Sequence, residues 1–264
     1  MMLIDGKPCD SLAATDRGLA FGDGVFRTLE WINSQPRLWA WQYARLCADA
    51  GRLSLTPPDE RALLAEISQA AAGLPRAVVK ITLTRGSGLR GYAISPDCRP
   101  TRIVNATPWD GYPPELQQQG VTLTLCALRL GIQPRLAGIK HLNRLECVLA
   151  RSEWSDPAIR EGLLLDSEGA VTECTMSNLF LVSGGELLTP LLDRCGVAGA
   201  MRAWILAHAP VREARIGLDA LMAAEEVFVC NSLIGIWPVA RLGERQWSSF
   251  GRAAHLLRLL DTQV

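Results

Sequence analysis

The segment Trp109-Asp-Gly-Tyr-Pro-Pro114 constrains the fold most, because it interrupts every periodic pattern in the chain. Glycine and consecutive prolines break helices and strands, so we expect a domain boundary at this point. The chain then divides into an N-terminal lobe over residues 1–108, a linker over 109–118 and a C-terminal lobe over 119–264. With 264 residues in total, each lobe is long enough to bury its own core.

The N-terminal lobe is predicted to combine strands with two helices. Runs rich in Val, Ile, Thr and Leu predict strands at Met2–Ile4, Val25–Trp31, Ala77–Thr84 and Arg102–Thr107. Helical patterns cover Trp41–Leu53 and Asp59–Ala72, and Pro57-Pro58 with Asp59 provides a start signal for the second.

The C-terminal lobe also mixes the two kinds of element. Strands are predicted at Val121–Leu128, Gly162–Leu165, Asn178–Val182, Val211–Ile216 and Val227–Cys230, and helices at Asn143–Trp154 and Ala198–His208. The elements lack the regular strand-helix-strand spacing of a doubly wound fold. The predicted fold class is therefore α+β, with two lobes of mixed sheets and packed helices.

Charge and cysteine content narrow the class of protein. The 27 basic residues offset the 27 acidic ones, so no net field attracts a polyanion, and nucleic acid is not an expected partner. Eight cysteines stand singly, without a CxxC pair or zinc-ligand spacing, so we expect free thiols and no metal. Residues 1–10 lack a signal-peptide pattern, and no apolar run of about 18 residues could span a membrane. These features predict a cytoplasmic protein with no membrane partner.

A lysine in an unusual setting is the first candidate for chemistry. Lys140 lies in Leu136-Ala-Gly-Ile-Lys-His-Leu-Asn-Arg-Leu-Glu146, after a flexible Ala-Gly pair and before a predicted helix. The apolar Leu136, Ile139 and Leu142 could lower its pKa and make the amine nucleophilic. On this segment alone, an ordinary surface lysine is the alternative interpretation.

Three other segments offer complementary groups. Glu173 is flanked by apolar Val171 and Met176, so its carboxylate needs a cationic partner, either a ligand or an arginine. Gly196-Val-Ala-Gly199 precedes a predicted helix, where backbone N–H groups favour an anion. Asn231-Ser232 and Arg45 could contribute further contacts to a phosphate.

Taken together, these segments resemble the fold-type IV pyridoxal-phosphate (PLP) enzymes, which are like D-amino acid aminotransferase in fold, and among them the aminodeoxychorismate lyases. The resemblance extends from Met2 to about Val239. The matching pieces, in order, are Asp16–Phe26, Arg45-Leu46, Arg85–Tyr92, Leu136–Glu146, Asp166–Glu173, Ser177–Phe180, Gly196–Gly199 and Cys230-Asn231. The runs AGIKHLNRLE and RGSGLRGY point to the lyases in particular.

The resemblance implies a role for each candidate residue, with PLP bound between the lobes. Lys140 would form the Schiff base and act as general base, and Glu173 would pair with the pyridine nitrogen. The phosphate would be held by Arg45, by the backbone of Val197 and Ala198, and by Asn231 and Ser232. Thr28 would lie near the reacting carbons, and Arg90 would bind a substrate carboxylate. Two positions depart from many relatives, namely Gln42, where a histidine is common, and Ala198, where some have a hydroxyl residue.

The function implied is a lyase of folate biosynthesis that converts 4-amino-4-deoxychorismate to 4-aminobenzoate and pyruvate. Relatives of this kind are homodimers, so a homodimer is expected here as well. An aminotransferase of the same fold, acting on D-amino or branched-chain amino acids, needs the same lysine, carboxylate and phosphate site. A binding module that has kept the fold without activity is the alternative from another class.

Overall fold

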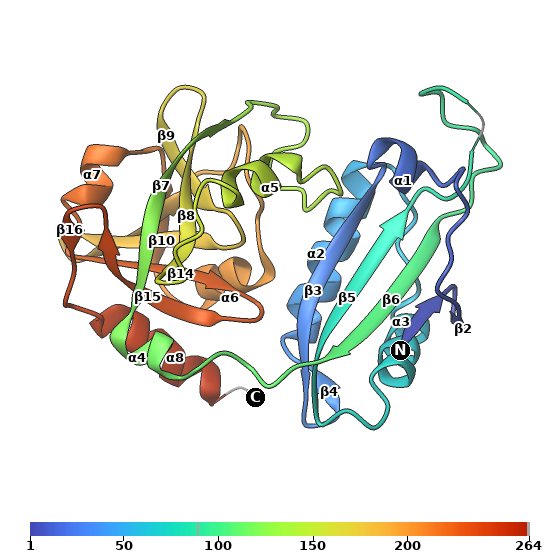
Figure 1. Cartoon of the computed structure of the whole chain (residues 1–264), viewed down its shortest axis with the longest axis horizontal. Helices are drawn as coiled ribbons and strands as arrows, with labels where there is room; N and C mark the ends of the chain where they lie inside the picture. Colours follow the sequence, from blue (N-terminus) through green and yellow to red (C-terminus); the bar gives the residue numbers. More distant parts are fainter. Residues whose placement is uncertain (89, 263–264) are drawn as a thin grey trace. The chain divides into compact units, whose positions relative to one another are not determined.

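The chain is described by a computed structural model that covers residues 1–88 and 90–262 and separates into two compact units. Unit 1 comprises Met1–Gly111 and the short segment Ile139–Asn143 (Figure 1). Unit 2 comprises Tyr112–Gly138 and the chain from Arg144 onward. Unit 1 therefore includes a short segment, residues 139–143, that the sequence analysis assigns to the C-terminal lobe. The contiguous division into two lobes and a linker over residues 109–118 stays a prediction.

Unit 1 is built on a six-stranded antiparallel sheet in the order β2-β1-β6-β5-β3-β4. Helix α2 (Trp39–Arg52) packs on β3, and helix α3 (Glu60–Ala70) packs on β6 and β1. Helix α3 begins where the Asp59 carboxylate accepts the N–H of Ala62 at 2.9 Å, as the start signal predicted. The remaining elements are β1 Met2–Ile4, β2 Lys7–Pro8, α1 Arg17–Phe21, β3 Gly24–Ile32, β4 Gln35–Pro36, β5 Arg76–Thr84 and β6 Thr101–Pro108.

Unit 2 contains a ten-stranded mixed sheet in the order β12-β11-β10-β14-β15-β7-β8-β9-β13, with β16 on β15. Its strands are β7 Val121–Leu130, β8 Ile159–Asp166, β9 Ala170–Cys174, β10 Asn178–Ser183, β11 Glu186–Pro190, β12 Val211–Ala214, β13 Ile216–Gly217, β14 Glu226–Asn231, β15 Gly235–Leu242 and β16 Arg245–Gln246. Its helices are α4 Glu115–Gln119, α5 Leu145–Arg151, α6 Ala200–His208, α7 Leu218–Met222 and α8 Gly251–Asp261. Helices α4 and α8 both pack on β15 (Figure 1). No helix of the described residues has the length and apolar character needed to cross a membrane.

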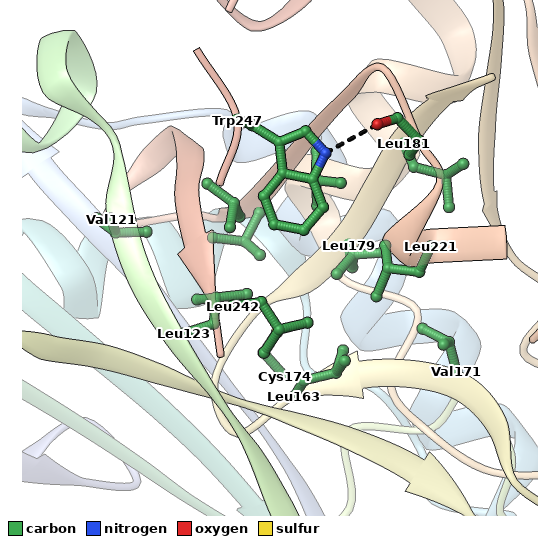
Figure 2. Close-up of a cluster of buried hydrophobic side chains, with 14 of the residues drawn as sticks. Val121, Leu123, Leu163, Val171, Cys174, Leu179, Leu181, Leu221, Leu242 and Trp247 are labelled. Carbon is green, nitrogen blue, oxygen red and sulfur yellow. Dashed lines mark hydrogen bonds between the residues drawn. The ribbon is translucent and has the colours of Figure 1, made fainter. Parts of the chain in front are cut away.

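A hydrophobic core of unit 2 is formed by buried side chains of its strands together with Trp247. Figure 2 shows Leu163, Leu179 and Leu242 in one apolar cluster with the Trp247 ring. The indole nitrogen donates to the main-chain oxygen of Ala224 at 2.9 Å, so its one polar group is satisfied within the apolar cluster. The predicted α+β class, with mixed sheets and packed helices, is confirmed.

Candidate active site

Lys140 lies in a segment that extends the sheet of unit 1. Its carbonyl oxygen accepts the N–H of Phe26 at 3.0 Å, and His141 forms a β-bridge with Val25. A side chain at Gly24 would place Cβ 2.4 Å from the carbonyl oxygen of Leu83, so only glycine allows this close approach. The half-buried Lys140 extends its amine over the Phe26 ring, 4.6 Å from the centroid. These main-chain contacts therefore hold the backbone of Lys140 against β3.

Thr28 follows Phe26 by two residues on β3. Alternate residues of a strand point to the same face, about 7 Å apart along it, so Thr28 shares the face over which the Lys140 amine lies. Thr28 is half-buried and stands opposite Lys80 of β5. The structure thus places the hydroxyl of Thr28 and the amine of Lys140 on one face of the same sheet.

Arg90 is exposed, on the loop between β5 and β6. The buried Arg17 anchors the two residues that follow Arg90. It donates to the carbonyl oxygens of Gly91 at 2.9 Å and Tyr92 at 3.1 Å. Arg17 is itself paired with Asp23 at 3.0 Å, and Arg85 binds the same carboxylate at 2.8 Å. The loop that carries Arg90 is therefore tied to the start of β3 through a buried arginine.

The Asp23 carboxylate makes the stability of this loop anchor dependent on pH. Burial raises the pKa of Asp23, but hydrogen bonds from Arg85 and Arg17 outweigh burial and hold the pKa below its ordinary value of 3.8. The folded state therefore binds this proton less readily than the unfolded chain does. The stabilisation is fully present above about pH 4 and is lost as the pH falls through the folded-state pKa.

We expect Asp23→Asn to be less stable than the wild type at pH 7, and the difference to shrink below about pH 4. Urea unfolding of both proteins between pH 7 and pH 3 measures this, with Asp10→Asn, at an exposed position of the same unit, as control. A difference that stays constant down to pH 3 would contradict the role given to the Asp23 ion pairs.

Arg45 lies in α2, and its side chain retains 27% exposure. Its guanidinium is 3.3 Å from the carboxylate of Asp49, one helical turn further on. Gln42 is a buried residue of the same helix. The exposed part of the Arg45 guanidinium can bind an anion while Asp49 restrains it.

In unit 2, Glu173 is 4% exposed at the end of β9. Its carboxylate accepts the N–H of Val197 at 2.8 Å, so the acid is fixed by the segment that precedes α6. The next N–H, that of Ala198, donates to the carbonyl oxygen of Gly138 at 3.0 Å. Both backbone donors expected to bind phosphate therefore have protein acceptors.

The N-terminus of α6 provides other backbone donors. The first helical bond runs from the N–H of Ala203 to the carbonyl oxygen of Gly199 at 3.0 Å, so the N–H groups of Ala200 and Met201 precede the helical ladder. Asn178 fixes this turn, donating to the oxygen of Val197 at 2.7 Å and accepting the N–H of Gly199 at 3.1 Å. A Cβ at Gly199 would lie 2.6 Å from the Asn178 amide oxygen, so a larger residue there would displace the Asn178 side chain.

Asn231 closes the turn after β14 with both ends of its side chain. The amide nitrogen donates to the carbonyl oxygen of Met176 at 3.1 Å. The amide oxygen accepts the N–H groups of Leu233 at 2.8 Å and Ile234 at 3.0 Å. Asn231 therefore shapes the turn that presents the half-buried Ser232.

A buried carboxylate that the sequence analysis did not single out holds the turn between β9 and β10. Glu161, 0% exposed, accepts hydrogen bonds from the hydroxyl of Ser177 at 2.7 Å and the N–H of Met176 at 3.0 Å. Burial raises the pKa of Glu161, while these hydrogen bonds and that from Thr175 oppose the rise. Because Met176 and Asn178 belong to the same turn, Glu161 supports both the Asn231 turn and the start of α6.

Sequence reasoning missed Glu161, Arg17 and Asp49, although Glu161 and Asp49 left a local signal. Glu161 directly precedes the apolar run Gly162–Leu165, and Asp49 is spaced four residues from Arg45. Charged side chains at such positions need partners when buried. Those partners lie far away in sequence, so only the fold identifies them.

Comparison with known proteins extends this picture. The family model "Amino-transferase class IV" matches residues 24–242. The aminodeoxychorismate lyase of Vibrio harveyi is 36% identical over 245 residues, covering 91% of this chain and 90% of that protein. The crystal structure of 4-amino-4-deoxychorismate lyase from Pseudomonas aeruginosa has a TM-score of 0.95 and 45% identity, covering 100% of this chain and 99% of that one. A D-alanine aminotransferase of Listeria monocytogenes serotype 4b is 30% identical over 235 residues, covering 86% of this chain and 81% of that protein.

Proposed function

Because this chain belongs to the class IV aminotransferase family, we propose that it is a PLP-dependent lyase that converts 4-amino-4-deoxychorismate to 4-aminobenzoate and pyruvate. The observation that carries this proposal is the likeness along the whole chain to the lyase from Pseudomonas aeruginosa. The aminotransferase relatives are less similar to this chain. The release of 4-aminobenzoate, a precursor used in folate biosynthesis, gives the enzyme its place in metabolism.

Three polar side chains of this chain fit PLP, the cofactor of this family. PLP presents an aldehyde, a basic ring nitrogen and a phosphate. The matching groups are the Lys140 amine, the buried Glu173 carboxylate held by Val197, and the guanidinium of Arg45. Lys140 is two residues along the chain from Gly138, whose N–H donates to the oxygen of Gly196 at 2.8 Å. We propose that these three groups serve one PLP molecule.

We assign the phosphate to Arg45, to the N–H groups of Ala200 and Met201, and to the Ser232 hydroxyl. This moves the backbone contact from Val197 and Ala198, whose N–H groups have protein acceptors. A helix N-terminus combines unbonded N–H groups with the positive end of the helix dipole, which favours a phosphate dianion. Val197 and Asn231 then act indirectly, by orienting Glu173 and shaping the turn before Ser232.

The remaining residues carry the chemistry and bind the substrate. PLP, when bound, supplies an electron sink next to the substrate amine. The neutral amine of Lys140 removes the proton from the amine-bearing ring carbon, and Glu173 keeps the pyridine nitrogen protonated. Thr28 donates a proton to the departing enolpyruvyl group. Arg90 binds a substrate carboxylate with two parallel hydrogen bonds.

The deciding experiment is incubation of the enzyme with PLP and 4-amino-4-deoxychorismate in the absence of any 2-oxo acid. A lyase releases pyruvate and 4-aminobenzoate in equal amounts, whereas an aminotransferase needs an amino-group acceptor for each turnover. If the absorbance band of added PLP did not shift in the presence of the protein, a binding module without activity would be favoured instead.

Arg45→Ala is expected to weaken PLP binding much more than turnover at saturating PLP. A charge-assisted contact to phosphate contributes about 1.5–3 kcal/mol, which corresponds to roughly a 10- to 150-fold increase in the Kd for PLP. Titration of the apoprotein with PLP measures this, and Arg52→Ala, an exposed arginine of the same helix, serves as control. An unchanged Kd for Arg45→Ala would remove Arg45 from the phosphate site.

We further propose that the protein acts as a homodimer in the cytoplasm. Helix α5 exposes Leu145 by 68%, Val148 by 62% and Leu149 by 51%, and their spacing places them on one helix face. An apolar face of this kind is typical of an interaction surface. All eight cysteines lie in the described residues as free thiols, which suits a reducing compartment. Sedimentation of the purified chain distinguishes a dimer from a monomer.

A further inference from the structure

Asp49 is a buried carboxylate that contacts two of the residues assigned to the cofactor. Its side chain is 1% exposed at the inner face of α2. One oxygen, Oδ2, accepts the main-chain N–H of Lys140 at 2.9 Å, across 91 residues of sequence. The other, Oδ1, lies 3.3 Å from the Arg45 guanidinium. One side chain therefore contacts both the backbone of the proposed Schiff-base lysine and the proposed phosphate arginine.

Arg27 holds this carboxylate from the other side. The Arg27 guanidinium, buried within unit 1, forms an ion pair with Asp49 Oδ2 and donates to the main-chain oxygen of Arg45 at 3.1 Å. Burial lowers the pKa of Arg27 to about 10, so the guanidinium remains charged at neutral pH. Arg27 thus binds α2 at two points, the Asp49 side chain and the Arg45 main chain.

Packing alone does not explain a buried ion pair at this position. The cost of removing two charges from water often exceeds their attraction, and apolar residues of similar volume stabilise a fold at least as well. Apolar residues, however, cannot accept the N–H of Lys140 or restrain the guanidinium of Arg45. The pair therefore provides hydrogen-bond geometry and local charge that an apolar contact would lack.

We propose that Asp49, held by Arg27, is a positioning residue for Lys140 and Arg45. The proposal rests on the proposed function, because it takes these two residues as the cofactor's anchors. By fixing the Lys140 N–H, Asp49 fixes the direction in which the Lys140 side chain leaves the backbone. By pairing with Arg45, it orients the guanidinium. Its negative charge offsets one of the two positive charges, those of Arg27 and Arg45, that contact it.

Asp49→Asn tests both the geometry and the charge. An asparagine has one accepting oxygen in place of two, so it cannot serve Lys140, Arg45 and Arg27 together. We expect the Kd for PLP to rise about 10- to 100-fold. Loss of the negative charge should also move the pH midpoint of the visible band of Lys140-bound PLP downward by about one unit.

A double variant separates positioning from stability. Asp49→Leu with Arg27→Met removes both buried charges, so we expect a folded protein with a Tm close to that of the wild type. PLP binding should still weaken about 10- to 100-fold. Hydrogen exchange of the apoprotein gives a reading without cofactor, in which the amide of Lys140 should exchange faster in this variant than in the wild type.

Glu30→Gln is the matched control. Glu30 is also fully buried on β3 and binds two arginines, Arg37 at 3.1 Å and Arg76 through a 2.6 Å hydrogen bond. The Glu30→Gln variant should lower the Tm without changing the Kd for PLP or the pH midpoint of the visible band of Lys140-bound PLP. Wild-type values for both measurements in Asp49→Asn or the double variant would overturn the proposal, and so would equal changes in Glu30→Gln. Pyruvate release by the wild type is assayed in parallel, so a failed lyase proposal is recognised separately from a failed positioning role.

Discussion

Lys140→Ala is expected to lower pyruvate release by at least about 10³-fold, because it removes the covalent attachment of PLP and the general base together. Alanine keeps the main-chain N–H that Asp49 accepts and the carbonyl that binds Phe26, so the backbone of the segment should be preserved. The loss should therefore appear in kcat while the Tm of the apoprotein stays near the wild-type value. The two measurements together distinguish loss of the amine from loss of the fold.

Lys80 provides a matched control for this prediction. Its amine lies 5.3 Å from the centroid of the same Phe26 ring over which the Lys140 amine lies at 4.6 Å. Lys80→Ala should retain lyase activity, since Lys80 has no part in the proposed chemistry. Borohydride reduction of the wild type with PLP should leave a pyridoxyl group on Lys140, as peptide mapping would show. A label on Lys80 or Lys7 would overturn the assignment.

Much of unit 1 could be predicted from sequence because its elements are local patterns. The run Ala77–Thr84 became β5 (Arg76–Thr84), and Asp59–Ala72 became α3 (Glu60–Ala70), capped by Asp59. Both have a regular period and a clear boundary residue. In such segments the local preference and the tertiary environment favour the same structure.

The pattern failed where tertiary contacts decide the element. Strand β15 (Gly235–Leu242) contains Pro238, which argues against a central strand, yet its neighbours β14 and β7 fix it in place. The helix expected at Asn143–Trp154 begins only at Leu145, and the Asn143 side chain donates to Gly22 of unit 1 instead. Helix α6 begins at Ala200, because the N–H of Ala198 is bonded to Gly138.

The candidate site divides in the same way. Lys140 and Glu173 could be proposed from the sequence because the motifs around them resemble those of the fold-type IV PLP enzymes, whereas their local settings alone favoured a surface lysine and a glutamate paired with an arginine. Asp49 could not, because its role depends on a contact with Lys140 that spans 91 residues. Similarly, the bonds of the Val197 and Ala198 N–H groups to Glu173 and Gly138 are known only from the folded chain.

The hydroxyl of Thr28 is expected to distinguish a lyase from an aminotransferase. An aminotransferase must return a proton to the C4′ carbon of PLP, a task that suits the amine of Lys140. A lyase must also protonate a departing enolpyruvyl group, and a second donor on the same face of β3 can do this without competing with Lys140. Thr28 lies on that face, two residues from Phe26, over whose ring the Lys140 amine is placed.

Thr28→Val should therefore lower kcat for pyruvate release by roughly 10²–10⁴-fold, the usual contribution of a general acid, with little change in the Kd for PLP. Valine keeps the branched shape that suits β3, so the strand should be unaffected.

Arg90→Ala gives the contrasting result, a raised KM with kcat nearly unchanged, because a carboxylate contact far from the breaking bond stabilises substrate and transition state alike. Steady-state kinetics with 4-amino-4-deoxychorismate measure both effects. If the wild type turned over D-alanine or leucine with 2-oxoglutarate as fast as it releases pyruvate, the lyase proposal would give way to the aminotransferase.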